Sequence, residues 1–135
     1  MIKRLLIILV ILLVTSCGVN KKDLYKLTIN DEDIYVGHSK KDSVVTSFSE
    51  LETDDEGVIT KIVLYPSEYD SSILINDVEI DDSISVDTEM YKGYIVDGQG
   101  VIDKSVSGKT NRIIFNNNIF NDNLDELDHI TILFE

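Results

Sequence analysis

Short runs in which apolar and polar residues alternate recur along most of the chain after residue 24. Leu27 and Ile29 alternate with polar neighbours, and Ile34 and Val36 continue the alternation beyond the polar cluster at 30–33. Alternation with a period of two, on both sides of turn-forming residues, is typical of a β-hairpin. The pattern therefore predicts a first hairpin over residues 25–36.

Similar runs predict further strands downstream. A run over residues 58–65 ends at Pro66, which has no amide hydrogen to donate to a sheet. Residues 73–75 and 78–80 flank Asn76-Asp77, and a two-residue turn of this kind favours a second hairpin because Asn tolerates positive φ. A third hairpin is expected to pair 94–96 with 101–102, and two more strands are expected at 113–115 and 129–135.

One helix is expected over residues 39–51. Ser39 can accept a hydrogen bond from the backbone of the following turn, and one helical face would hold four apolar residues, namely Val44, Val45, Phe48 and Leu51. The alternative is a strand, because β-branched residues are stiff in helices. A second, single helical turn is expected at 123–127. The predicted fold is α+β, a mostly antiparallel β-sheet with one short helix.

A six-residue pattern occurs twice at a distance of 46 residues. Ile29-Asn30-Asp31 with Ile34 returns as Ile75-Asn76-Asp77 with Ile80, and residues 114–119 contain a looser echo. One interpretation is a reused hairpin, and the other is chance in a chain rich in Asn and Asp. The pattern alone leaves both open.

The N-terminal residues have the layout of an export signal. Lys3 and Arg4 precede ten apolar residues at 5–14, and Thr15-Ser16 lead to Cys17, which is the sole cysteine. The apolar run is too short for a stable helix across a bilayer of roughly 30 Å, which takes about 20 residues. Val14-Thr15-Ser16-Cys17 resembles the lipobox of bacterial lipoproteins. The resemblance implies that the Cys17 sulfur carries a diacylglyceryl group and that the signal is removed in front of it.

This resemblance sets the expected organisation of the chain. We expect a signal peptide at 1–16, a lipidated Cys17 with a tether at 17–23, and a β-rich globular domain at 24–135. Acyl chains such as palmitate would hold the domain on the extracytoplasmic side of the cell membrane, since two or more chains anchor far more firmly than one. The alternative is an uncleaved signal anchor in which Cys17 is a buried thiol.

The charge and the cysteine content limit the kinds of molecule that we expect this protein to bind. Removing residues 1–16 takes away two of the 12 basic residues and none of the 25 acidic ones, which leaves a net charge of −15 on 119 residues. Nucleic acid is therefore not an expected partner, because phosphate contacts depend on Lys and Arg. With Cys17 acylated, the domain has no cysteine for a disulfide or a metal site. Its length fits one domain.

An acidic segment resembles half of a calcium-binding loop. Glu52, Asp54 and Glu56 stand at the first, third and fifth positions, and Gly57 stands at the sixth. The twelfth position, where a bidentate carboxylate is needed, is Val63. An acidic turn before a strand is the favoured interpretation, and weak calcium binding by these three carboxylates is the alternative.

The two histidines do not form a recognisable catalytic or metal motif. Neither His38 nor His129 has a local partner at metal-ligand spacing, and the adjacent His38 and Ser39 would need a third group and a strained turn to act as a hydrolase. The sequence thus predicts a non-enzymatic lipoprotein without a cofactor that binds an unknown envelope protein or polymer. A calcium-responsive domain and, less favoured, a small envelope hydrolase are the alternatives.

Overall fold

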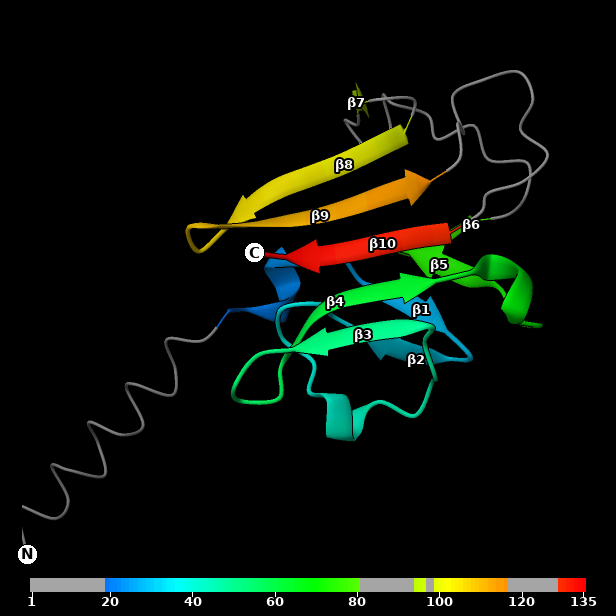
Figure 1. Cartoon of the computed structure of the whole chain (residues 1–135), viewed down its shortest axis with the longest axis horizontal. Coiled ribbons are helices and arrows are strands. Elements are labelled where there is room, and N and C mark those ends of the chain that lie inside the picture. Colours follow the sequence, from blue (N-terminus) through cyan, green and yellow to red (C-terminus); the bar gives the residue numbers. More distant parts are fainter. Residues whose placement is uncertain (1–18, 81–93, 97–98, 117–128) are drawn as a thin grey trace, which may run out of the picture.

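The computed structural model describes residues 19–80, 94–96, 99–116 and 129–135. Within these residues the chain forms strands joined by short turns and three single-turn 3-10 helices (Figure 1). Their bounds are η1 Lys21–Asp23, β1 Leu27–Ile29, β2 Glu32–Ile34, η2 Lys41–Ser43, β3 Glu50–Thr53, β4 Ile59–Leu64, η3 Pro66–Glu68, β5 Ile73–Ile75, β6 Val78–Ile80, β7 Tyr94–Val96, β8 Gln99–Val106, β9 Lys109–Asn116 and β10 His129–Phe134.

The strands form two antiparallel sheets that pack face to face. The smaller sheet has the order β2-β1-β5-β6, and the larger has the order β3-β4-β10-β9-β8-β7. In Figure 1 the strands of the smaller sheet lie behind those of the larger one. Two packed antiparallel sheets make a β-sandwich, in which one face of each sheet is buried against the other.

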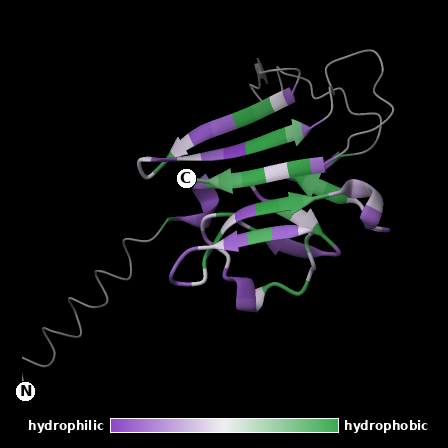
Figure 2. Ribbon diagram, in the orientation of Figure 1, coloured by the Kyte–Doolittle hydropathy of each residue, from purple (hydrophilic) through white to green (hydrophobic). Residues whose placement is uncertain are grey.

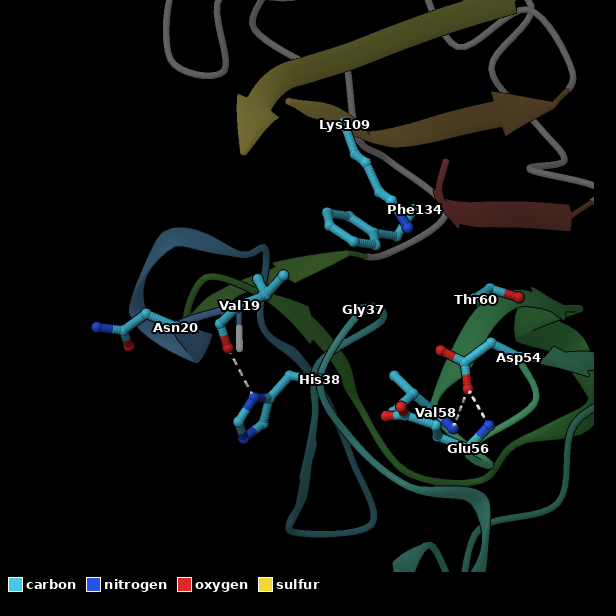
Figure 3. Close-up of a pocket in the computed structure, with 10 residues that line it drawn as sticks. All are labelled: Val19, Asn20, Gly37, His38, Asp54, Glu56, Val58, Thr60, Lys109 and Phe134. Atoms are coloured by element: carbon cyan, nitrogen blue, oxygen red, sulfur yellow. Dashed lines mark hydrogen bonds between the residues drawn. The ribbon is translucent and has the colours of Figure 1, made fainter. Parts of the chain in front are cut away.

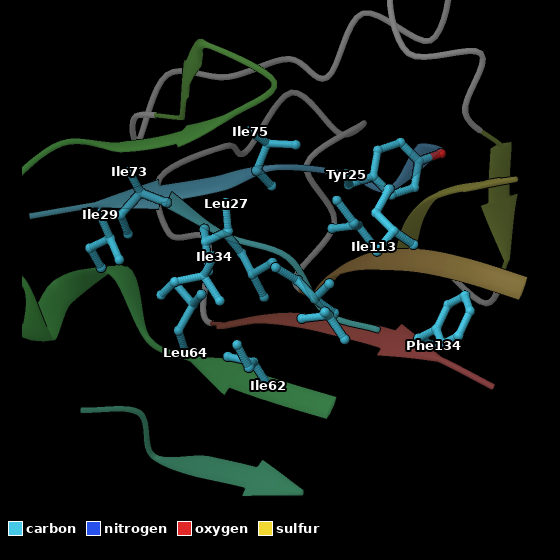
Figure 4. Close-up of a cluster of buried hydrophobic side chains, with 14 of the residues drawn as sticks. Tyr25, Leu27, Ile29, Ile34, Ile62, Leu64, Ile73, Ile75, Ile113 and Phe134 are labelled. Atoms are coloured by element: carbon cyan, nitrogen blue, oxygen red, sulfur yellow. The ribbon is translucent and has the colours of Figure 1, made fainter. Parts of the chain in front are cut away.

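The core lies between the sheets and follows from the alternation in the sequence. Buried and partly exposed positions alternate along β1, β5 and most of β9, and Figure 2 shows hydrophobic and hydrophilic bands along the strands of the larger sheet. Inward side chains from both sheets join in one buried cluster (Figure 4). The smaller sheet contributes Leu27, Ile29, Ile34, Ile73 and Ile75, and the larger contributes Ile62, Leu64, Ile113, Phe115, Ile130, Ile132 and Phe134. Packing of these aliphatic side chains provides the main stabilisation, because burial of apolar surface is the dominant favourable term in folding.

The two Ile-Asn-Asp copies fold alike and pair with each other. Each is a hairpin with a two-residue turn in which both residues have positive φ, 53° and 61° at Asn30 and Asp31 and 49° and 67° at Asn76 and Asp77. These are the dihedrals of the turn type that matches strand twist. Strands β1 and β5 are antiparallel neighbours with Leu27 opposite Ile75 and Ile29 opposite Ile73. The hairpins are therefore related by a local twofold axis.

The predicted α+β fold is wrong, because the segment expected as a helix contains only η2. The Ser39 hydroxyl does not cap a following turn but accepts a hydrogen bond from the preceding Tyr35 amide at 2.8 Å. Lys40 forms a β-bridge with Val58. The Glu32 carboxylate then binds the amides of Val45 and Thr46, so that no helical hydrogen bonds form there. The described residues form an all-β fold with no helix longer than one turn.

The predicted strands are otherwise confirmed. The hairpins at β1–β2, β5–β6 and β7–β8 pair as expected, β4 ends before Pro66, and β10 buries Ile130, Ile132 and Phe134 on one face. Strand β3 was not predicted, and β8 and β9 are longer than expected. Three expected features lie wholly or partly outside the described residues. They are the N-terminal residues 1–18, the helical turn at 123–127 and the second half of the looser copy of the repeat at 114–119.

Candidate functional site

A hollow of about 520 Å³ opens at the end of the sandwich where the described chain begins (Figure 3). Its volume is within the range typical of small-molecule sites. Segments far apart in the sequence converge on it, and its lining residues are Val19, Asn20, Gly37, His38, Asp54, Glu56, Val58, Thr60, Lys109 and Phe134. We call this feature the end hollow.

The first wall of the end hollow is the N-terminal segment, which packs onto the sandwich from Val19 onward. The side chain of Val19 is half-buried against the core, and its carbonyl oxygen lies 3.0 Å from Nδ1 of His38. Because a carbonyl oxygen can only accept, Nδ1 of His38 is the donor. The Asn20 side chain caps η1 by accepting from the Lys22 amide at 3.1 Å. Residues 19–23, which include most of the expected tether, therefore lie against the domain.

A buried asparagine fastens the same segment to the larger sheet. Asn111, on the inward face of β9, has no exposed surface. Its Oδ1 accepts from the Tyr25 amide at 2.9 Å, and its Nδ2 donates to the Leu133 carbonyl at 3.0 Å. Both ends of the amide are thus satisfied, as a buried polar side chain requires. The contact joins the start of the domain to its last strand.

Lys104 and Tyr25 add a second link beside Asn111. The Lys104 ammonium lies 4.4 Å from the centroid of the Tyr25 ring, a distance that suits a cation–π contact. Burial lowers the pKa of Lys104, and the nearby Asp23 carboxylate partly opposes this. Burial, with a contribution from Asp103, raises the pKa of Tyr25 to about 12. At neutral pH the phenol therefore stays protonated and the contact is between a cation and a neutral ring.

The second wall is the turn between β3 and β4. Oδ1 of Asp54 accepts from the amides of Glu56 at 2.9 Å and Val58 at 3.0 Å, and Gly57 in this turn has a φ of 81°. Asp54 therefore shapes the turn with one carboxylate oxygen. In the described part of the chain no hydrogen bond or ion pair reaches the Glu56 carboxylate, which leaves it available to a ligand of opposite charge.

The third wall combines a cation with an aromatic ring. Lys109 follows the two-residue turn Ser107-Gly108, whose φ values are 51° and 78°, and its ammonium lies 5.5 Å from the centroid of the Phe134 ring. That ring packs directly on Gly37, where an added Cβ would lie only 2.7 Å from Cγ of Phe134. Glycine is therefore required at 37 both for space and for its φ of 103°.

The end hollow contains two of the three carboxylates singled out as calcium candidates. Asp54 and Glu56 line it, whereas Glu52 stands on β3 opposite Lys61. Among the residues that the structure describes, no group of three or more His, Cys, Asp or Glu side chains converges as a metal site would require. Cys17 lies outside these residues, and the ranges from 19 to 135 that are described contain no helix that could span a membrane.

The histidines are placed at opposite ends of the sandwich. His38 uses Nδ1 on a main-chain carbonyl, and the neighbouring Ser39 hydroxyl is engaged by the Tyr35 amide. His129 begins β10 and packs against Tyr65 with ring centroids 5.3 Å apart. Among the residues that the structure describes, no hydrogen bond joins His38 to a serine or a carboxylate.

Sequence reasoning missed the residues that join segments across the fold. Asn111 was not predicted as a functional residue, although the alternation Asn111, Ile113, Phe115 would have placed it on the buried face of a longer strand. Gly37 and Val19 carry no such signal, because only the folded chain brings them to Phe134 and His38. No protein-family model, no curated protein and no solved structure matches this chain.

Proposed function

We propose that this protein is a lipid-anchored, non-enzymatic binding module on the extracytoplasmic side of the membrane, and that the end hollow is its recognition site. The observation that carries the proposal is the position of the end hollow. Val19 is one of its walls and stands two residues after Cys17. Two residues span at most roughly 7 Å. A lipidated Cys17 would hold this end of the sandwich against the bilayer surface.

The charges in the end hollow suit a small ligand with groups of both signs. Lys109 supplies a cation, Glu56 and the second oxygen of Asp54 supply anions, and Val58 and Phe134 supply apolar surface. The net charge of the mature chain, −15, repels a strongly anionic surface. A headgroup that carries both an amine and a phosphate, presented by the same leaflet, fits this lining and this position.

Metabolic labelling tests the anchor. Radioactive palmitate supplied to a host that processes lipoproteins should label the full-length protein, and Cys17→Ala should remain unlabelled although it is made. Ser16→Ala is the matched control, since it leaves the thiol in place and should be labelled. Absence of label from the wild-type protein, or equal label on the alanine variant at 17, would overturn the proposal.

Binding of a soluble headgroup tests the end hollow separately. Glycerophosphoethanolamine, titrated into the detergent-solubilised protein, should shift the NMR signals of residues 56–60 and 109, whereas glycerophosphoglycerol, which lacks the amine, should not. Lys109→Gln and Glu56→Gln should each abolish the shifts, and Glu79→Gln, on the distant β6, should leave them unchanged. Equal shifts with both compounds would show that the lining does not recognise a zwitterion.

A further inference from the structure

The loop before β3 presents an apolar side chain to solvent. Residues 44–49 join η2 to β3 and include a hydrophobic stretch (Figure 2). Val45 is 90% exposed, the one large apolar side chain among the described residues with such exposure. A single exposed valine is common on protein surfaces. The loop that carries Val45, however, is held by several side-chain hydrogen bonds.

The carboxylate of Glu32 clamps the loop. Oε2 accepts from the Val45 amide at 2.9 Å, while Oε1 accepts from the Thr46 amide at 2.9 Å and from the Thr46 hydroxyl at 2.7 Å. Partial burial would raise the pKa of Glu32, but these three hydrogen bonds outweigh burial and lower it. The clamp is therefore a carboxylate at neutral pH, and hydrogen bonds to a charged acceptor are the stronger kind.

Tyr69 and Glu68 hold the second half of the loop. The Tyr69 hydroxyl donates to the Ser47 carbonyl at 2.6 Å, and the Ser49 hydroxyl donates to the Glu68 carboxylate at 3.0 Å. The Phe48 and Tyr69 rings are in contact, with centroids 6.4 Å apart. The loop is thus fixed at both halves, and a partner would bind it without the cost of ordering it first.

A second hollow lies between this loop and β3. Its volume is about 360 Å³, and its walls include Val44, Val45, Phe48 and Leu51. Leu51 is the inward-facing residue of β3, since it stands opposite the buried Ile62. We call this feature the edge hollow. It is a recess of mixed polarity beside the edge strand of the larger sheet, and Lys41, Thr46 and Ser47 complete its lining.

The outer side of β3 is acidic. Glu50 and Glu52 flank Leu51 and so point to the opposite face. On that face Nζ of Lys61 lies 3.2 Å from Oε1 of Glu50 and forms an ion pair with it. The strand is the first in its sheet, and among the described residues no hydrogen bond reaches its unpaired backbone edge. A register shift between Glu52 and Thr53 ends the regular ladder. The open edge thus presents Leu51 and the edge hollow on one face, two glutamates on the other, and a length of about one short strand.

We propose that β3 and the 44–49 loop form a docking surface for an extended segment of a partner protein in which cationic and apolar residues alternate. Successive side chains of an added strand point to opposite faces. One set would enter the edge hollow beside Val45, and the other would lie beside Glu50 and Glu52. A second copy of this acidic edge would be repelled, because like charges on adjacent strands are unfavourable. The charges of Glu50 and Glu52 therefore oppose pairing of β3 with β3 of a second copy and favour a partner strand with basic residues.

A capped peptide of alternating Lys and Val, seven residues long, tests the proposal on the full-length protein in non-ionic detergent. Fluorescence anisotropy should show binding that weakens as salt is raised. Amide hydrogen exchange should slow at residues 50–53 when the peptide is present. The same peptide with N-methyl groups on alternate amides cannot form the ladder and should not bind.

Two double variants separate local recognition from general attraction to an acidic protein. Glu50→Gln with Glu52→Gln should weaken peptide binding by roughly three- to tenfold, as expected for loss of two cross-strand charge pairs. Asp33→Asn with Glu79→Gln makes the same change in net charge on the smaller sheet and should leave binding unchanged. Val45→Ser should weaken binding without altering the melting temperature, because that side chain is 90% exposed in the free protein.

Absence of peptide binding, equal weakening by the two double variants, or undiminished binding of the N-methylated peptide would overturn the inference. Exchange protection confined to β2, β6 or β7 would likewise assign the peptide to another edge. None of these outcomes depends on whether Cys17 carries a lipid.

Discussion

Replacement of Gly37 by alanine should be far more damaging than the same change at the other two described glycines with positive φ. A Cβ at 37 would lie 2.7 Å from Cγ and 2.9 Å from Cδ1 of Phe134, which is only 6% exposed. At Gly57 and Gly108, with φ of 81° and 78°, an added Cβ meets nothing within 4 Å. The three positions therefore separate the cost of backbone strain from the cost of steric overlap.

The expected magnitudes follow from these two terms. A left-handed conformation costs a residue with a Cβ about 1 to 2 kcal/mol. Overpacking of a core side chain that cannot move aside costs about 1 to 3 kcal/mol more. Gly57→Ala and Gly108→Ala should thus each lower the free energy of unfolding by about 1 to 2 kcal/mol, and Gly37→Ala should lower it by about 2 to 5 kcal/mol.

Urea unfolding of the three variants in non-ionic detergent, followed by far-UV circular dichroism, measures these differences. The chain has no tryptophan, and its six tyrosines provide a second, fluorescence signal. Gly37→Ala should cost less stability in the Phe134→Leu background than in the wild-type protein, because the smaller leucine side chain leaves room for a methyl group. Equal destabilisation at 37 and 57, or no coupling in the double variant, would refute the steric argument.

Four further predictions follow from single contacts. The pKa of Glu32 is lower in the folded than in the unfolded chain, so its hydrogen bonds to the loop are fully formed above the ordinary glutamate pKa and are lost as the pH falls through the lowered value. Amide hydrogen exchange at residues 45–46 should report this loss. Glu32→Gln should speed that exchange by roughly fivefold at neutral pH, which is equivalent to about 1 kcal/mol. Asn111→Ala leaves two backbone groups without their partner and should cost about 2 kcal/mol or more in urea unfolding. Asp31→Gly relieves a positive φ in a turn that favours Asn-Gly and should stabilise by up to about 1 kcal/mol, and a loss of stability would contradict the turn assignment. Millimolar calcium should leave the melting temperature unchanged, because Asp54 already uses one oxygen within its turn; a clear upward shift would favour the calcium-responsive alternative.

Local signals were sufficient to predict most of the hairpins. Asn76-Asp77 between two apolar runs specifies a tight turn, and the turn then fixes which residues of β5 and β6 stand opposite each other. Pro66 likewise marks the end of β4, since it cannot donate to a sheet. In these places the residues that determine the structure lie within about ten positions of each other.

The helix prediction failed because a distant residue decides the structure of the segment. Residues 44–51 satisfy a helical pattern and, less clearly, a strand pattern. Glu32, at least 12 residues earlier, supplies acceptors for the amides at 45 and 46, and β4 then offers an edge to which Glu50 and Leu51 pair. Intrinsic preference is a weak guide when tertiary hydrogen bonds compete with it.

The candidate site was predictable only in part for a similar reason. Asp54 and Glu56 were noticed for their spacing, and they do line the end hollow. The spacing resembles half of a calcium loop, but in the structure it belongs to a turn in which Asp54 accepts hydrogen bonds from the backbone. The cation and the ring that complete the hollow come from residues 109 and 134, and no pattern within one segment reveals that convergence.

The twofold relation between the two Asn-Asp hairpins has a consequence for molecules held close together. Strand β1 joins β5 through an antiparallel ladder in which Leu27 and Ile29 lie opposite Ile75 and Ile73, and each strand leads into an Asn-Asp turn. Exchange of the two hairpins between molecules would keep this ladder, which is the condition for domain swapping.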